Sequence, residues 1–155
     1  MEIENTIRAY ATPIFSAAGL EPSAVSIHLV ADDSLNAFGA GGQRLFMNTG
    51  TLMAAEDPGE VIGVIAHEAG HIAGGHLARL QEELQNAQIK SILAMVLGAV
   101  AGVATGEGGV AGAVASAGQG DALGGLLKYN RTQESAADAA GMKYLDATGQ
   151  SSRGM

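Results

Sequence analysis

An apolar stretch that abruptly carries three ionisable side chains constrains this chain more than any other feature. Residues 61–66 are aliphatic or glycine, and they run directly into His67, Glu68 and His71. Asp57 can cap the start of a helix, so the stretch predicts a largely buried helix that begins there. Ionisable groups are costly to bury without a partner or a purpose. We therefore expect this helix to bring all three groups to one shared site.

The spacing of the two histidines is that of a metal site. His67 and His71 lie four residues apart, so on a helix both imidazoles leave the same face and can bind one zinc ion. Zinc lowers the pKa of a bound water to about 7, and Glu68 is placed to accept the proton of that water as it attacks a carbonyl. The chain has no cysteine, which suits a catalytic rather than a structural zinc ion. The alternative is a buried helix with two structural histidines.

A catalytic zinc ion needs a third protein ligand besides water, and two residues are candidates. His76 lies five residues after His71, and at about 100° per residue it points away from that residue if the helix continues. Glu134 is the better candidate and falls on a later helix predicted to begin near Arg131. Asp138 lies one turn further on the same face, where it can accept a hydrogen bond from the far nitrogen of a ligating histidine.

These motifs resemble the zinc-binding signatures of a known family of metallopeptidases. The segment from His67 to His71, with Glu134 and Asp138 after it, is similar to the HExxH and ExxxD motifs of the gluzincins HtpX, BepA and the CAAX prenyl protease. The resemblance covers about residues 25–147 and is closest to the periplasmic BepA-like branch. It implies that His67, His71 and Glu134 hold one zinc ion per chain. It also implies that Asp138 is a proton donor and that the chain acts in the bacterial periplasm or at the membrane periphery.

The pattern around these motifs predicts a mainly helical α+β fold, a zincin-like metalloprotease domain. Apolar residues recur at helical spacing over residues 3–14, which indicates an amphipathic helix ending near Gly19. Residues 25–29 and 43–48 alternate as two short strands of a small sheet or hairpin before the HExxH helix. We expect residues 43–48 to be the edge strand that aligns a peptide above the metal. An ordinary hairpin is the alternative.

A second apolar region lies between the two halves of the predicted metal site. Residues 91–106 and 108–120 contain no charged side chain, and only Glu107 separates them. Each run is shorter than the roughly 18–20 residues that cross a bilayer. We predict a short, glycine-rich helical hairpin over residues 89–120, inserted in the peptidase domain. It can serve as a lid, a membrane-dipping hairpin or an oligomer contact, and the sequence does not choose among these.

Composition and charge exclude several classes of protein. Hydrophobic residues make up 47% of the chain and charged residues 15%, which excludes disorder. The net charge of −8 argues against nucleic-acid binding and leaves apolar contact as the route to a membrane. The acidic start is not a signal peptide, and the last residues read as a loop. We expect residues 1–155 to be a single peptidase domain from a longer protein, lacking a signal peptide and a C-terminal part.

The leading functional hypothesis is a zinc-dependent metalloendopeptidase. Its substrates would be extended or unfolded polypeptides, in the quality control of misfolded or membrane-associated proteins. A zinc hydrolase that acts on non-peptide amides is one alternative. A chaperone-like binding module, which captures partners with the apolar hairpin, is another.

Overall fold

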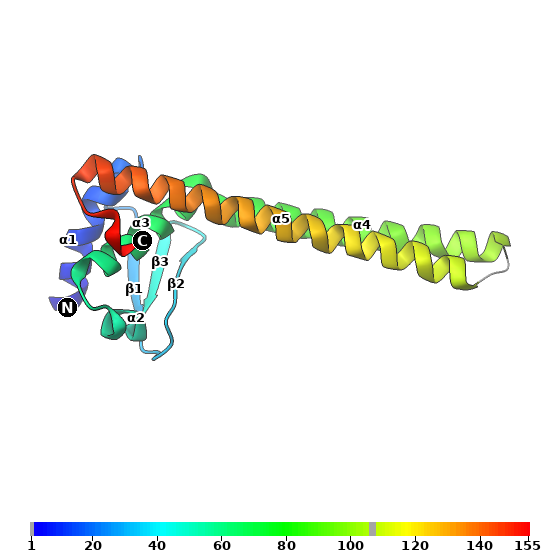
Figure 1. The fold of residues 1–155 in the computed structure, drawn as a ribbon, viewed down its shortest axis with the longest axis horizontal. Coiled ribbons are helices and arrows are strands. Elements are labelled where there is room, and N and C mark those ends of the chain that lie inside the picture. Colours follow the sequence, from blue (N-terminus) through cyan, green and yellow to red (C-terminus); the bar gives the residue numbers. More distant parts are fainter. Residues whose placement is uncertain (1, 106–107) are drawn as a thin grey trace. The chain divides into compact units, whose positions relative to one another are not determined.

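The computed structural model describes residues 2–105 and 108–155 and divides into two compact units (Figure 1). The first comprises Met1–Leu77 and Gln133–Met155, and the second comprises Ala78–Thr132. The elements, in chain order, are α1 (Glu2–Ala17), β1 (Ser26–Val30), β2 (Ala37–Ala40), β3 (Arg44–Asn48), α2 (Thr49–Ala54), α3 (Pro58–Gly74), α4 (His76–Thr105), α5 (Gly108–Thr148) and the 3-10 helix η1 (Ser152–Gly154). The predicted mainly helical α+β fold, with a small sheet before the HExxH helix, is confirmed.

The sheet has three strands in the order β1-β3-β2. β1 runs parallel to β3, with Ser26 opposite Arg44, whereas β2 is antiparallel to β3, with Ala37 opposite Met47. The expectation that residues 43–48 form an edge strand is therefore wrong. The turn at 41–43 folds β2 back onto one side of β3 and β1 occupies the other, so β3 is the central strand and β2 lies at an edge.

The core of the first unit forms between the sheet, α1 and α3. Leu45 and Met47 point to the buried face of β3, as the alternation of a strand requires, and both are fully buried. On the opposite face Phe46 stacks between His28 and Phe38. The buried cluster consists of Ile7, Ala11, Ile14, Phe15, Val25, Leu45, Met47, Val61, Ile65, Ala66, Ala69 and Leu145. Burial of each large aliphatic or aromatic side chain contributes about 1.5–3 kcal/mol, so this cluster fixes α3 against the sheet.

Both ends of α3 follow from local sequence. The Asp57 carboxylate accepts hydrogen bonds from the backbone N–H groups of Gly59 and Glu60, at 2.6 and 3.3 Å, as expected for a helix cap. At the other end Gly75 has φ 62°, a left-handed conformation that glycine adopts without a steric penalty. The helix therefore stops after Gly74, and His76 begins α4.

A close approach of two helices holds α5 against α3 in the first unit. A Cβ atom added at Gly70 would lie 2.8 Å from the carbonyl oxygen of Ala137 and 3.0 Å from its Cα. Only glycine lets the two backbones meet at this distance. The predicted start of this helix near Arg131 is wrong, because α5 already begins at Gly108.

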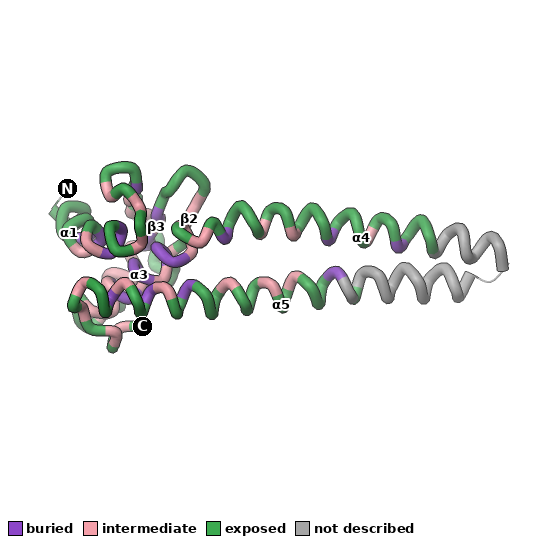
Figure 2. Tube along the Cα trace, turned by 90° about the horizontal axis from the view of Figure 1, so that it is seen from above, coloured by how far each residue is buried: buried purple, intermediate pink, exposed green. Residues whose placement is uncertain are grey.

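The second unit consists of α4 and α5 packed side by side. Among the residues of this unit whose burial the structure describes, the buried ones are small, namely Ala87, Ala94 and Ala122. The buried positions of α4 lie on the side that faces α5 (Figure 2). No helix among the described residues is both long and apolar enough to cross a bilayer. The predicted hairpin over 89–120 includes residues 106–107, which lie outside the described residues, so its insertion in a single peptidase domain stays a prediction.

The contact at Gly70 generates a first prediction. Gly70→Ala places a methyl group against the backbone of α5, and overpacking of this kind costs about 1–3 kcal/mol. This exceeds the gain of about 1 kcal/mol that alanine brings to a helix. We expect a lower midpoint of thermal unfolding by circular dichroism. Gly124→Ala is the control, because a Cβ atom there meets nothing within 4 Å. A midpoint at or above that of wild type in Gly70→Ala would contradict the close packing.

Candidate metal centre

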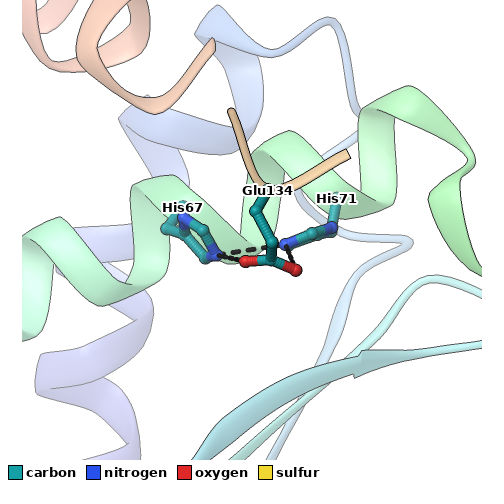
Figure 3. A group of neighbouring side chains, drawn as sticks. All are labelled: His67, His71 and Glu134. Atoms are coloured by element: carbon teal, nitrogen blue, oxygen red, sulfur yellow. Dashed lines mark hydrogen bonds and ion pairs between the residues drawn. The ribbon is translucent and has the colours of Figure 1, made fainter. Parts of the chain in front are cut away.

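Two elements of the first unit bring three potential ligands together. His67 and His71 leave one face of α3, and Glu134 descends from α5 between their imidazoles (Figure 3). The Glu134 carboxylate places Oε2 3.4 Å from Nε2 of His67 and Oε1 3.5 Å from Nε2 of His71. Among the described residues these three form a group whose ligand atoms all lie within 4.8 Å of one another.

The distances within this group fit a tetrahedral zinc ion. Ligands bound at about 2.0–2.2 Å from zinc lie about 3.3–3.6 Å from one another. The two distances to Glu134 fall in this range, and the two Nε2 atoms, 3.0 Å apart, need only a small separation. Imidazole nitrogen and carboxylate oxygen are also ligands that zinc prefers. Three protein ligands leave a fourth position for water.

The far nitrogen of each imidazole has its own partner. Nδ1 of His67 lies 2.7 Å from Oδ1 of Asp138, and Nδ1 of His71 lies 2.8 Å from Nδ1 of His76. A histidine that donates a proton from Nδ1 keeps its lone pair on Nε2. The contact with Asp138 therefore favours the tautomer in which the Nε2 lone pair of His67 points at the carboxylate of Glu134. The contact with His76 is compatible with the same tautomer of His71. Two lone pairs and an anion repel one another unless a cation or a proton lies between them.

Burial makes the second histidine a better metal ligand. It lowers the pKa of His71, although the negative charge of Glu134 favours the protonated form. A metal binds only the neutral imidazole. The lowered pKa thus keeps His71 in the form that a metal ion requires.

Glu68 lies beside the group without belonging to it. Only 8% of its surface is exposed, and its Oε2 accepts a hydrogen bond of 2.9 Å from the backbone N–H of Gly39 on β2. Burial raises the pKa of Glu68 to about 7, although the charge of His67 and the Gly39 N–H favour the ionised form. A carboxyl group with a pKa near neutrality can both take up and release a proton at pH 7.

A pocket of about 380 Å³ adjoins the group on the side of Glu68 and Asp138. One wall is β2, where Ala37 and Met47 form a non-hydrogen-bonded pair, so the backbone N–H and C=O of Ala37 point away from β3. The pocket is lined by Leu35, Asn36, Ala37, Thr51, Gly63, Val64, His67, Glu68, Asp138, Gly154 and Met155. It is a concave site in which reactive side chains and an open strand edge meet.

The structure brings all five residues singled out from the sequence into one region. His67, His71 and Glu134 form the group, while Glu68 and Asp138 flank it. Sequence reasoning missed two features. The backbone N–H of Gly39 leaves no trace in side-chain patterns. The contact between His76 and His71 was signalled by Gly75, a helix-ending residue that makes a continuous helix the wrong assumption.

The chain is similar to known proteases over most of its length. The profile of peptidase family M48 matches residues 2–155. The chain is 29% identical over 121 residues to a putative beta-barrel assembly-enhancing protease of Vibrio cholerae serotype O1, and 29% over 125 residues to the beta-barrel assembly-enhancing protease of Yersinia pestis. It is 26% identical over 124 residues to that of Escherichia coli strain K12. The matches cover 78–79% of this chain, which spans about a quarter of the relatives' length.

The group predicts the effect of removing its carboxylate. Glu134→Ala leaves two imidazoles, one ligand short of a catalytic zinc site. We expect stoichiometric zinc in purified wild type and less than a tenth of an equivalent in the variant, measured by elemental analysis after dialysis. Asp146→Ala removes an exposed acid from the same helix and should keep full zinc. Full occupancy in Glu134→Ala would overturn the ligand assignment.

The contact between Asp138 and His67 predicts a milder effect. Outer-shell partners of metal ligands typically account for about 10- to 100-fold in metal affinity. We expect Asp138→Ala to weaken zinc binding by that factor in competition with a chelator, and Asp138→Asn, which keeps an acceptor, to weaken it less. Equal affinities in all three proteins would show that Asp138 does not orient His67.

Proposed function

The chain belongs to peptidase family M48, and from this premise we propose that it is the catalytic region of a zinc-dependent metalloendopeptidase. The observation that carries the proposal is the convergence of His67, His71 and Glu134, with Glu68 beside them and an open pocket in front. Zinc bound by these three ligands would supply a Lewis acid for the peptide carbonyl and lower the pKa of water.

Glu68 is the proposed general base. The Gly39 N–H engages Oε2 and so leaves Oε1 to take a proton from the attacking water. The carboxyl group then passes this proton to the nitrogen of the leaving amine as the C–N bond breaks. Burial holds the pKa of this carboxyl group above its usual range, which favours the uptake of a proton from water. Asp138 contacts Nδ1 of His67, and this contact supports a role in positioning that histidine. The family resemblance implies a second role for Asp138, that of a proton donor.

The proposed substrate is an extended or unfolded polypeptide. An extended chain can add to an open strand edge through backbone hydrogen bonds, and a folded protein has few free segments of this kind. The edge of β2 at Ala37 lines the pocket next to Glu68, so it replaces β3 as the strand that aligns the peptide. The pocket beside it would receive one side chain of the substrate.

The proposed setting is protein quality control in the bacterial periplasm or at the membrane periphery. Similar proteins are named beta-barrel assembly-enhancing proteases, and this name supports a role close to membrane-protein assembly. The apolar residues 89–120 would supply a peripheral membrane or oligomer contact. The chain spans about a quarter of the length of these relatives, so its own substrates are part of the proposal.

A chaperone-like binding module is the second candidate. It is favoured by large apolar side chains that α4 and α5 leave exposed, among them Ile89, Ile92, Leu93, Leu123 and Leu127. An apolar surface of this kind can capture unfolded chains without cleaving them. The binding-module hypothesis does not explain why Glu68 is buried beside the group of His67, His71 and Glu134. We therefore favour the peptidase.

One substitution separates these functions. Glu68→Gln keeps the volume of the side chain and the zinc ligands but removes the base. We expect zinc to be retained and the cleavage of casein to fall by at least about 100-fold, in line with the size of general-base effects. Glu82→Gln, an exposed glutamate on α4, is the control and should cleave like wild type.

The outcome is read from zinc content and casein cleavage together. A wild-type chain that binds zinc and casein but leaves the casein intact would favour the binding module. Cleavage of small non-peptide amides without cleavage of casein would favour the alternative of a zinc hydrolase that acts on non-peptide amides. If Glu68→Gln cleaves casein as fast as wild type, Glu68 is not the general base.

A further inference from the structure

His76 lies next to the metal group without joining it. It is the first residue of α4, and only 8% of its surface is exposed. Its Nδ1 lies 2.8 Å from Nδ1 of His71, and the two rings meet edge to face at 84°. The Nε2 atom of His71, on the other side of that ring, faces Glu134. His76 therefore cannot share a metal ion with the three ligands, and it contacts one of them from behind.

Two consecutive glycines bring the ring of His76 to this position. The left-handed Gly75 ends α3 and redirects the chain, with its N–H bonded to the carbonyl groups of His71 and Ile72. A Cβ atom on Gly74 would overlap Nε2 of His76. The missing side chain at Gly74 thus provides the space in which the ring stands against His71.

We propose, on the basis of the proposed zinc site, that His76 is a positioning residue that fixes the tautomer and orientation of His71. A histidine that binds zinc through Nε2 carries its proton on Nδ1. That N–H of His71 donates to Nδ1 of His76, which accepts because its own proton is on Nε2. The bond holds the His71 lone pair on the line toward the metal before zinc arrives.

A neutral partner suits this position better than a carboxylate. Asp138 already places a negative charge behind His67, and Glu68 and Glu134 add two more carboxyl groups nearby. A further charge behind His71, which is less exposed than Asp138, would be costly to desolvate. An imidazole provides the acceptor without that cost. The two histidines are thus held by different partners, one an exposed carboxylate and the other a buried imidazole.

The alternative is that His76 only fills space at the junction of α3 and α4. His76→Phe separates the two roles, since it keeps an aromatic ring of similar volume but removes the acceptor. His76→Asn restores an acceptor, because Oδ1 of asparagine can stand near the position of Nδ1. Gly74→Ala keeps His76 and displaces its ring. His28→Phe is the matched control, because His28 is exposed on the far side of the sheet and stacks on Phe46.

The experiment measures zinc affinity by chelator competition in the purified chain. We expect a fall of about 10- to 100-fold for His76→Phe and Gly74→Ala, a partial recovery in His76→Asn, and no change in His28→Phe. Nitrogen-15 NMR of the zinc-loaded wild type should show a slowly exchanging proton on Nδ1 of His71. The same proton should exchange rapidly in His76→Phe.

Each outcome decides a different question. A folded His76→Phe protein with wild-type affinity and a protected His71 proton would overturn the positioning role. If His76→Phe fails to fold, wild-type affinity in Gly74→Ala overturns the role, whereas weakened binding there with recovery in His76→Asn supports it. Absence of zinc binding in wild type overturns the proposed function and this inference with it. If wild type binds zinc normally, a negative result in the variants contradicts only the proposed role of His76 and leaves the proposed function standing.

Discussion

The contact between the backbones of α3 and α5 at Gly70 and Ala137 is the constraint on which the site depends. α3 alone can supply His67, Glu68 and His71, because all three leave one helix. The Glu134 carboxylate comes from a distant part of the chain, and it reaches the two histidines because two helix backbones meet where a side chain is missing. Glu134 lies about one helical turn before Ala137, and Asp138 directly follows Ala137. The contact between Gly70 and Ala137 therefore positions both acids.

The electrostatics of the site follow from this packing. Glu68 is buried against the amide of Gly39 and has a pKa of about 7, whereas Glu134 and Asp138 keep much of their surface in solvent. Two imidazoles and three acids within one small region form an arrangement that a divalent cation would stabilise. The partners behind His67 and His71 determine where the lone pairs point. In this way the binding geometry exists before a metal ion enters.

The sequence predicted which side chains gather at the site better than it predicted the arrangement of the strands. Local rules sufficed for α3, because the cap at Asp57 and the spacing of His67 and His71 depend only on neighbouring residues. Residues 43–48 were wrongly predicted to be an edge strand, since pairing across the sheet depends on which strand the turn at 41–43 folds back. The start of α5 was also missed, because the glycines between 108 and 125 are tolerated inside a helix. The amide of Gly39 could not be predicted, because backbone groups carry no residue-specific signal.

The central claim is that one zinc ion is bound by His67, His71 and Glu134 together. The most direct measurement is a crystal structure of the zinc-loaded chain, with anomalous data collected on both sides of the zinc absorption edge. We expect one anomalous peak about 2.0–2.2 Å from Nε2 of both histidines and from a carboxylate oxygen of Glu134. A peak bound instead by His76, or the absence of a peak between α3 and α5 at full zinc saturation, would contradict it.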